Sequence, residues 1–161
     1  MTWDPLKALR VLVRHDVRFV VIGGFAGRLW GSPTVTNDLD VCYSRDPDNL
    51  ERLATALREL RAELRGVTDV LFALDAESLA EGMNFPFATS AGALDLLGEP
   101  AGRLRYDDLV EAAAAVDLGR GLVVPVADLD DLIHLKRSAA RPKDLIEVEV
   151  LEAVRAEIDA R

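Results

Sequence analysis

The sequence predicts an α/β fold of the α+β kind, with a mixed sheet flanked by helices and further helices at the C-terminal end. Short β-branched runs alternate with amphipathic segments over most of the chain. After residue 127 only helical patterns remain. A length of 161 residues suits a single domain with one core. We expect the core of that domain at about 15–126 and a C-terminal helical part at 127–161.

The first half of the chain predicts helices and strands in alternation. Asp4 followed by Pro5 is typical of a helix start. A β-branched run that ends at Gly23-Gly24 indicates a buried strand. Gly31-Ser32-Pro33 ends the short helix that follows. The expected elements are helices at 5–14, 25–30 and 47–64 and strands at 17–22 and 38–43.

The second half predicts several strands and then helices. The alanine run at 111–116 favours a helix. Pro125 marks the run at 122–126 as an edge strand or as a strand near its end. The expected elements are strands at 69–74, 84–89, 93–97 and 122–126, and helices at 106–116, 128–138 and 142–158.

Composition narrows the possible functions. The longest apolar run is only a few residues, and the start MTWDPLKALR lacks the order of a secretory signal, so we expect no membrane partner. Cys42 is the single cysteine and cannot form an internal disulfide, which favours a reducing cytoplasm. One cysteine and no close histidine pair argue against a structural zinc site.

Charge argues against general nucleic-acid binding, with one local exception. The net charge is −9 and the pI about 4.7, whereas phosphate binding depends on lysine and arginine. The segment 134–143 nevertheless carries Lys136, Arg137, Arg141 and Lys143 without an acid. It could bind a polyphosphate or an RNA end, or simply be a solvated helix end.

Two aspartates stand one residue apart inside an apolar run. Alternate side chains of a strand share a face, so Asp38 and Asp40 should project together while Leu39 and Val41 face the core. Two carboxylates this close repel each other unless a cation lies between them, and Mg²⁺ prefers such oxygen ligands. An isolated pair of this kind is also typical of an exposed strand with solvated acids.

The pair of glycines upstream of the aspartates favours a metal site over an exposed strand with solvated acids. Gly23-Gly24 lies between an expected strand and an expected helix. Glycine permits close approach of the backbone, and the helix start offers free N–H groups to a phosphate. Together, these features place a phosphate-binding turn beside a metal site.

These residues resemble the polymerase-β-type nucleotidyltransferase superfamily, whose motif is Gly-Gly or Gly-Ser followed, after a spacer, by Asp-h-Asp-h, where h is apolar. Thirteen residues separate Gly24 from Asp38. More closely, the chain is similar to minimal nucleotidyltransferases of the AbiEii toxin type. The segments that carry this resemblance are VVIGGFAGRLWGSPTVTNDLDV, TSAGALDLLGE and HLKRSAARPKDLIEVEVL. It implies a nucleotidyltransferase-like fold.

The resemblance also implies a site. Asp95, a lone acid in an apolar run, matches the superfamily's third metal-binding carboxylate in type and setting. A buried aspartate is costly unless it is paired or bound to metal, and the alternative is a turn or cap carboxylate. Glu99 is the weaker candidate. Lys136 and Lys143-Asp144 match a functionally important pattern of AbiEii-type relatives. We therefore expect Asp38, Asp40, Asp95 and Lys136 to be catalytic, the three aspartates to bind Mg²⁺ or Mn²⁺, and the nucleotide to be bound by Gly23, Gly24, Arg28, Thr36, Lys143 and Asp144.

The implied reaction transfers a nucleoside monophosphate from an NTP to a hydroxyl. The acceptor would be an RNA or tRNA end or a protein, favoured over a drug, and the chain would act as the toxin beside an antitoxin partner. The alternative is a non-catalytic nucleotide-binding or antitoxin-like module with the same fold.

Overall fold

The computed structural model describes residues 2–67 and 71–161. Its helices are α1 (Pro5–Arg14), α2 (Gly23–Trp30), α3 (Pro47–Glu59), α4 (Ala76–Glu81), α5 (Tyr106–Ala112), α6 (Leu129–Ala139) and α7 (Pro142–Asp159), with a 3₁₀ turn η1 at Ala101–Arg103. Its strands are β1 (Phe19–Ile22), β2 (Asp38–Tyr43), β3 (Glu63–Leu64), β4 (Asn84–Thr89), β5 (Gly92–Leu97), β6 (Ala114–Asp117) and β7 (Val123–Val126).

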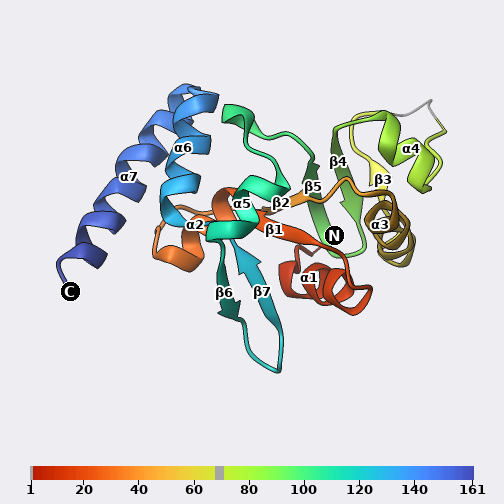
Figure 1. Cartoon of the computed structure of the whole chain (residues 1–161), viewed down its shortest axis with the longest axis horizontal. Helices are drawn as coiled ribbons and strands as arrows, with labels where there is room; N and C mark the ends of the chain where they lie inside the picture. The colour runs from red at the N-terminus through yellow and green to blue at the C-terminus, as the bar shows by residue number, and fades with distance from the viewer. Residues whose placement is uncertain (1, 68–70) are drawn as a thin grey trace.

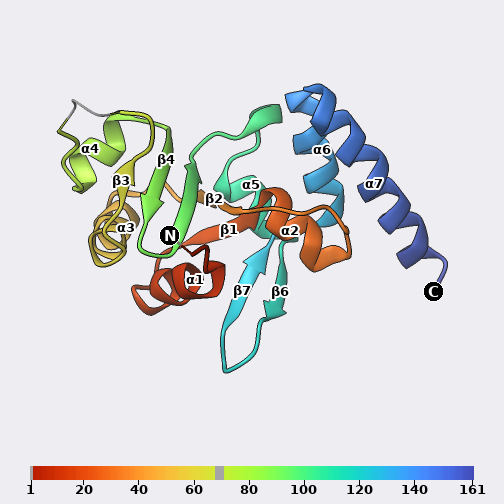
Figure 2. The ribbon, with the colours of Figure 1, turned by 180° about the vertical axis from the view of Figure 1, so that it is seen from behind.

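The strands form one mixed sheet in the order β3-β4-β5-β2-β1-β7-β6. β2 pairs antiparallel with β1 and parallel with β5, and β1 pairs parallel with β7. Helices α3 and α4 lie at the β3–β4 end of the molecule, and α6 and α7 lie side by side at the opposite end (Figures 1 and 2). This confirms the expected mixed sheet with flanking and C-terminal helices.

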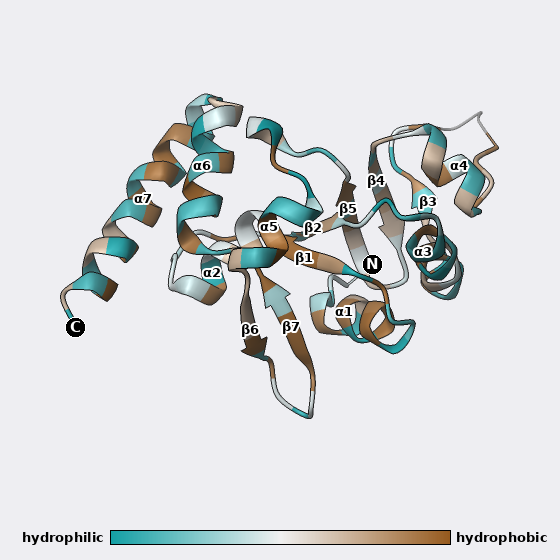
Figure 3. Cartoon of the chain, in the orientation of Figure 1, coloured by the Kyte–Doolittle hydropathy of each residue, from teal (hydrophilic) through white to brown (hydrophobic). Residues whose placement is uncertain are grey.

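The core forms around the central strands. All four residues of β1 are buried, and Leu39 and Val41 of β2 are fully buried, as the alternation in the sequence predicts. Figure 3 shows the apolar residues on the central strands and more polar residues on the outer helices. Leu151 and Val154 of α7 belong to the same cluster of buried residues. None of the helices in the described ranges is long and apolar enough to cross a membrane.

Several predicted boundaries of helices differ from those in the structure. The helix expected at 106–116 ends at Ala112, because the following alanines form β6 and pair with β7, so tertiary pairing overrides helix propensity. The helix expected to reach Leu64 ends at Glu59, and the chain turns at Arg61, where φ is 53°. Helix α2 begins at Gly23 rather than Phe25.

Four further differences concern three strands and one short helix. β7 lies between β1 and β6 and is therefore not an edge strand, although Pro125 is one residue from its end. β1 begins at Phe19 instead of Val17. In the strand expected at 69–74, residues 69 and 70 lie outside the described part and 71–74 form no strand. Helix α4 was not expected, although Asp75 caps it by accepting a hydrogen bond from the Ser78 N–H.

Candidate active site

Strand register brings three carboxylates together. Asp40 of β2 is paired with Asp95 of β5, and Asp38 lies on the same face two residues before Asp40. Neighbouring strands are about 4.8 Å apart, so side chains in register on one face meet. One carboxylate oxygen from each of Asp38, Asp40 and Asp95 lies within 4.8 Å of the other two. The structure therefore assembles the three predicted aspartates in one cluster.

Asp40 is electrostatically the most strained of the three. Burial, together with the charges of Asp38 and Asp95, raises the pKa of Asp40 to about 7. Lys136 acts in the opposite direction by favouring the charged carboxylate. A carboxyl group held in this environment gains from any cation that binds beside it.

The donor set of the cluster fits a small hard cation. Mg²⁺ binds oxygen ligands at about 2.0–2.1 Å, so two ligands on opposite sides of the ion are about 4.2 Å apart. One oxygen from each of the three carboxylates lies within 4.8 Å of the others, so the three side chains can converge on one ion. Asp38, Asp40 and Asp95 are thus suited to holding Mg²⁺ or Mn²⁺.

The glycine turn lies directly against this cluster. Gly23 has a φ of 71°, and a Cβ at this position would overlap the carboxylate of Asp40. A Cβ on Gly24 would lie 2.9 Å from Thr36 Oγ1. The N-cap residue of α2 is Ile22, which has no side-chain cap, so the first N–H groups of the helix are available for an anion.

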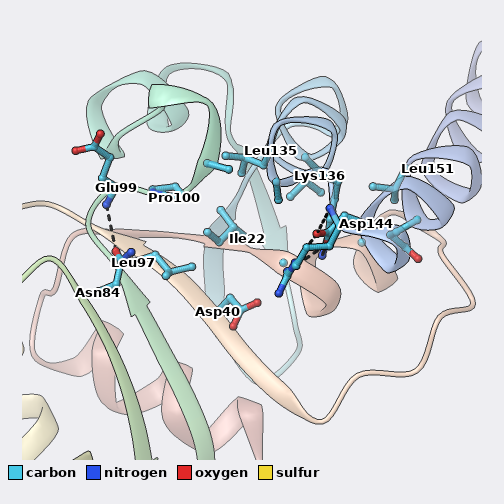
Figure 4. Close-up of a pocket in the computed structure, with 17 residues that line it drawn as sticks. Ile22, Asp40, Asn84, Leu97, Glu99, Pro100, Leu135, Lys136, Asp144 and Leu151 are labelled. Atoms are coloured by element: carbon cyan, nitrogen blue, oxygen red, sulfur yellow. Dashed lines mark hydrogen bonds and ion pairs between the residues drawn. The ribbon is translucent and has the colours of Figure 1, made fainter.

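Cationic side chains approach the cluster from the C-terminal helices. The Nζ of Lys136 on α6 lies 3.5 Å from Asp144 Oδ1 on α7. Arg141 also binds Asp144, with 2.6 Å between Nε and Oδ2. Asp144 is 1% exposed, and although its burial raises its pKa, the hydrogen bond from Arg141 and the charges of Lys136 and Arg141 lower it overall. Asp144 therefore orients two cations (Figure 4).

A polar cavity of about 420 Å³ joins the acidic and basic groups. The three aspartates and Lys136 line it, as do Gly24 and Thr36. Further polar lining comes from Lys143, Arg141, Thr34, Asn37, Asp144 and Glu147. Such a cavity can hold an anion that brings its own cations, which is how a metal-bound triphosphate would bind.

A second cavity of about 230 Å³ lies on the other side of Asp40. It shares Asp40 and Lys136 with the polar cavity, but much of its wall is apolar. The labelled apolar residues around it in Figure 4 are Ile22, Leu97, Pro100, Leu135 and Leu151. Apolar lining with a few convergent polar groups is typical of a small-molecule site.

Some residues that the sequence singled out lie elsewhere. Arg28 donates to the carbonyl oxygens of Pro33 and Thr34 and lines neither cavity, so its role in nucleotide binding stays a prediction. Arg137 points to Glu152, so the basic segment does not act as one patch. Glu99 pairs with Arg105 and lines the apolar cavity, but it lies outside the carboxylate cluster.

Three residues near the site were not among the expected site residues. Arg141 and Glu147 line both cavities. The carboxylate of Glu147 is buried and accepts hydrogen bonds from Ser32 Oγ (2.8 Å) and Thr34 Oγ1 (2.6 Å). Its position three residues after Asp144 would have placed it on the same helix face. Arg65 binds Asp95, and no sequence pattern indicated this contact.

Comparison with known proteins gives structural relatives only. No family model matches the sequence, and no curated protein matches it. A crystal structure of a provisionally assigned nucleotidyltransferase from Thermotoga maritima is 17% identical, with a TM-score of 0.54, over 98% of this chain and 91% of that one. The solution structure of the antibiotic-resistance factor ANT(2'')-Ia is 16% identical, with a TM-score of 0.55, over 98% and 90%.

A third solved structure adds an antibiotic-bound relative. The lincosamide antibiotic adenylyltransferase LnuA, crystallised with lincomycin, is 10% identical, with a TM-score of 0.59, over 93% of this chain and 95% of that one. These identities are low, and the likeness extends over nearly the whole length of both chains. The chain therefore has the nucleotidyltransferase-like fold.

Proposed function

We propose that this chain is a metal-dependent nucleotidyltransferase that moves a nucleoside monophosphate from an NTP to a hydroxyl acceptor. The observation that carries the proposal is the cluster of Asp38, Asp40 and Asp95 beside the turn at Gly23. Nucleotidyltransferases among the solved structures share the fold and support the proposal.

The protein's own residues account for positioning and charge. Asp38, Asp40 and Asp95 would hold Mg²⁺ or Mn²⁺, which supplies charge neutralisation at the transferred phosphoryl group. Gly24 and Thr36 would contact the phosphates from one side of the polar cavity, and Lys136 from the other. Most of the catalysis would come from alignment and electrostatic stabilisation.

The reaction proceeds at the α-phosphorus of the NTP. The acceptor oxygen forms a bond to that phosphorus, and the bond to the bridging oxygen of pyrophosphate breaks. The acceptor's proton passes to a carboxylate of the cluster. Lys136 lies within reach of the charge that develops on the leaving pyrophosphate.

The proposed acceptor is an RNA or tRNA end or a protein hydroxyl, with the chain acting as the toxin of a toxin–antitoxin pair. Lys143 and Arg141 at the rim of the polar cavity could bind the phosphates of such an acceptor. A small drug is the second candidate, because the apolar cavity beside Asp40 is suited to a compact ligand. LnuA and ANT(2'')-Ia, which share this fold, are both associated with antibiotics.

The test is transfer of label from NTPs that carry ³²P at the α-phosphate, in the presence of Mg²⁺. Three acceptor sets are compared: total tRNA, a bacterial lysate digested with RNase, and a panel of aminoglycosides and lincosamides. Label in only one set identifies the acceptor class. Asp38→Ala and Asp40→Ala should abolish transfer, whereas Arg137→Ala, which changes a cation outside both cavities, should not.

The non-catalytic alternative gives a different result. A nucleotide-binding module would bind NTP without transferring label in any acceptor set, and Asp38→Ala would change binding alone. The toxin role has its own test, in which expression of the wild-type chain arrests growth and the Asp40→Ala chain does not. Growth that is unaffected by an active enzyme would contradict the toxin role.

A further inference from the structure

An arginine outside both cavities holds one of the three clustered carboxylates. Arg65 Nη2 lies 2.5 Å from Asp95 Oδ1, and Arg65 Nη1 donates to the carbonyl oxygen of Phe87 at 2.6 Å. The structure gives this guanidinium two fixed partners, one on the backbone and one in the acidic cluster. The contact concerns Asp95 alone, since the ion pairs of the described residues include none between Arg65 and Asp38 or Asp40.

The backbone fixes the position of Arg65 as well. Its N–H donates to the carbonyl oxygen of Pro86 at 2.9 Å, which continues the β3–β4 pairing beyond Leu64. Pro86 is in turn paired with Asp95 across β4 and β5. Arg65, Pro86 and Asp95 thus follow one row across three neighbouring strands, and the side chain of Arg65 spans the middle strand.

The environment of the pair strengthens it. The side chains of Arg65 and Asp95 are 35% and 22% exposed, so the ion pair is partly removed from water. Hydrogen bonds between charged groups in such surroundings are shorter and stronger than those between neutral groups. Arg65 therefore restrains Asp95 through Oδ1, so binding of one ion by both oxygens of Asp95 would require Arg65 to move or to share Oδ1.

The ion pair between Arg65 and Asp95 affects which cation can bind at the carboxylate cluster. Mg²⁺ takes about six ligands in a nearly ideal octahedron at about 2.0–2.1 Å and accepts single carboxylate oxygens. Ca²⁺ takes roughly six to eight ligands at about 2.3–2.6 Å and often binds both oxygens of one carboxylate. An aspartate with one oxygen already occupied can serve the first geometry and is a poor ligand for the second.

We infer that Arg65 is a specificity-determining residue of the metal site, which favours Mg²⁺ and Mn²⁺ over Ca²⁺ by restricting Asp95 to one ligating oxygen. The inference rests on the metal site of the proposed function. Arg65 acts through Asp95 and is a positioning residue. Its removal frees the second oxygen of Asp95 and lets the site adapt to the larger ion.

The experiment measures the ratio of two metal affinities in the full chain. Free Mn²⁺ is quantified by its electron paramagnetic resonance signal during titration, and Ca²⁺ is then added as a competitor. Arg65→Met should shift the ratio of the two dissociation constants about tenfold towards Ca²⁺. Loss of the positive charge alone changes the affinity for both divalent ions equally and cancels in the ratio.

Control variants distinguish an effect of Arg65 on metal preference from general destabilisation of the fold and from failure of the proposed function. Arg65→Gln provides a second variant if Arg65→Met folds poorly, and the same shift is expected. Arg137→Met, which removes a paired arginine elsewhere, should leave the ratio unchanged. If Asp38→Asn abolishes Mn²⁺ binding but the Arg65 variants leave the ratio unchanged, the inference is overturned and the metal site stands. If the wild-type chain binds no Mn²⁺, both are overturned.

Discussion

Gly23 and the carboxylate of Asp40 are packed so closely that only a hydrogen atom fits between them. We expect Gly23→Ala to reduce the free energy of unfolding by roughly 2–4 kcal/mol, because it adds steric overlap to backbone strain at a φ of 71°. Displacement of Asp40 should also abolish nucleotidyl transfer. Urea denaturation and the labelled-NTP assay measure the two effects.

The matched control for this prediction is Gly121→Ala. Gly121 has a φ of 77°, but a Cβ there would meet no atom within 4 Å. Gly121→Ala should reduce the free energy of unfolding by about 1 kcal/mol through backbone strain alone and keep full activity. Equal losses in the two variants would show that the contact with Asp40 is unimportant.

Asp40→Asn should stabilise the protein in the absence of divalent metal. The pKa of Asp40 is about 7 in the folded protein, compared with 3.8 for an ordinary aspartate in water, so folding favours its protonated form. The folded chain therefore holds more protons than the unfolded chain between these values, and stability decreases as the pH rises from about 4 to about 7. At a pH of about 8 the variant should be more stable by roughly 1–3 kcal/mol.

The pH dependence and the response to metal check the same prediction. The difference between wild type and Asp40→Asn should shrink towards a pH of about 4, where the folded-state carboxyl is protonated and the unfolded one is becoming so. Mg²⁺ should raise the melting temperature of the wild type more than that of the variant, because ligand binding to the folded state stabilises it. If Asp40→Asn is less stable than the wild type at a pH of about 8, burial of the charged Asp40 carboxylate is not destabilising and the prediction is wrong.

Loss of Lys136 should mainly reduce transfer activity, whereas loss of Asp144 should reduce stability. Lys136→Met leaves Asp144 paired with Arg141, so stability should change by less than about 1 kcal/mol, whereas transfer activity should fall by roughly 100-fold or more. Asp144→Asn removes the buried partner of two cations and should cost roughly 1–3 kcal/mol. Thermal denaturation and initial rates distinguish the two variants.

The contribution of Asp144 also has a defined pH window. Its pKa is lowered overall in the folded protein, since the hydrogen bond from Arg141 and the charges around it outweigh burial. The stability it provides is therefore present above a pH of about 4 and is lost as the pH falls further. Asp144→Asn should be harmful at a pH of about 7 and progressively less harmful as the pH falls below about 4, as measured by urea denaturation.

Glu147 should be coupled to Ser32 and through it to nucleotide binding. The buried carboxylate of Glu147 accepts the Ser32 hydroxyl at 2.8 Å and anchors the loop that leads to Thr36. Ser32→Ala and Glu147→Gln should show a coupling energy of about 1 kcal/mol in a double-mutant cycle. Both single variants should raise the KM for NTP more than they lower kcat, and additive losses without a KM effect would contradict the anchoring role.

Local patterns in the sequence predicted the features that lie within one segment. The alternation around Asp38 and Asp40 predicted their shared face, and the structure has it. The cap at Asp4 and the breaker at Gly31 predicted two helix ends that the structure confirms. The mixed sheet with C-terminal helices was likewise predictable from the order of the segments.

Features that depend on pairing between distant segments were not predictable in the same way. The alanines of β6 become a strand only because β7 pairs with them, and nothing local indicates this. The contact of Arg65 with Asp95 depends on the register of β3, β4 and β5. The hydrogen bonds from Arg28 to the carbonyl oxygens of Pro33 and Thr34 were not indicated by the sequence either, and its role at the phosphates stays a prediction.

The order of the two halves of the site along the chain has a consequence for synthesis on the ribosome. The three clustered aspartates all precede residue 96, while Lys136 and Arg141 follow it by a wide margin. A nascent chain folds from its N-terminal part first, so the carboxylates emerge well before the side chains that would neutralise a triphosphate. An unfinished polypeptide would lack Lys136 and Arg141, so we expect the proposed transfer to begin only after α6 and α7 have been translated.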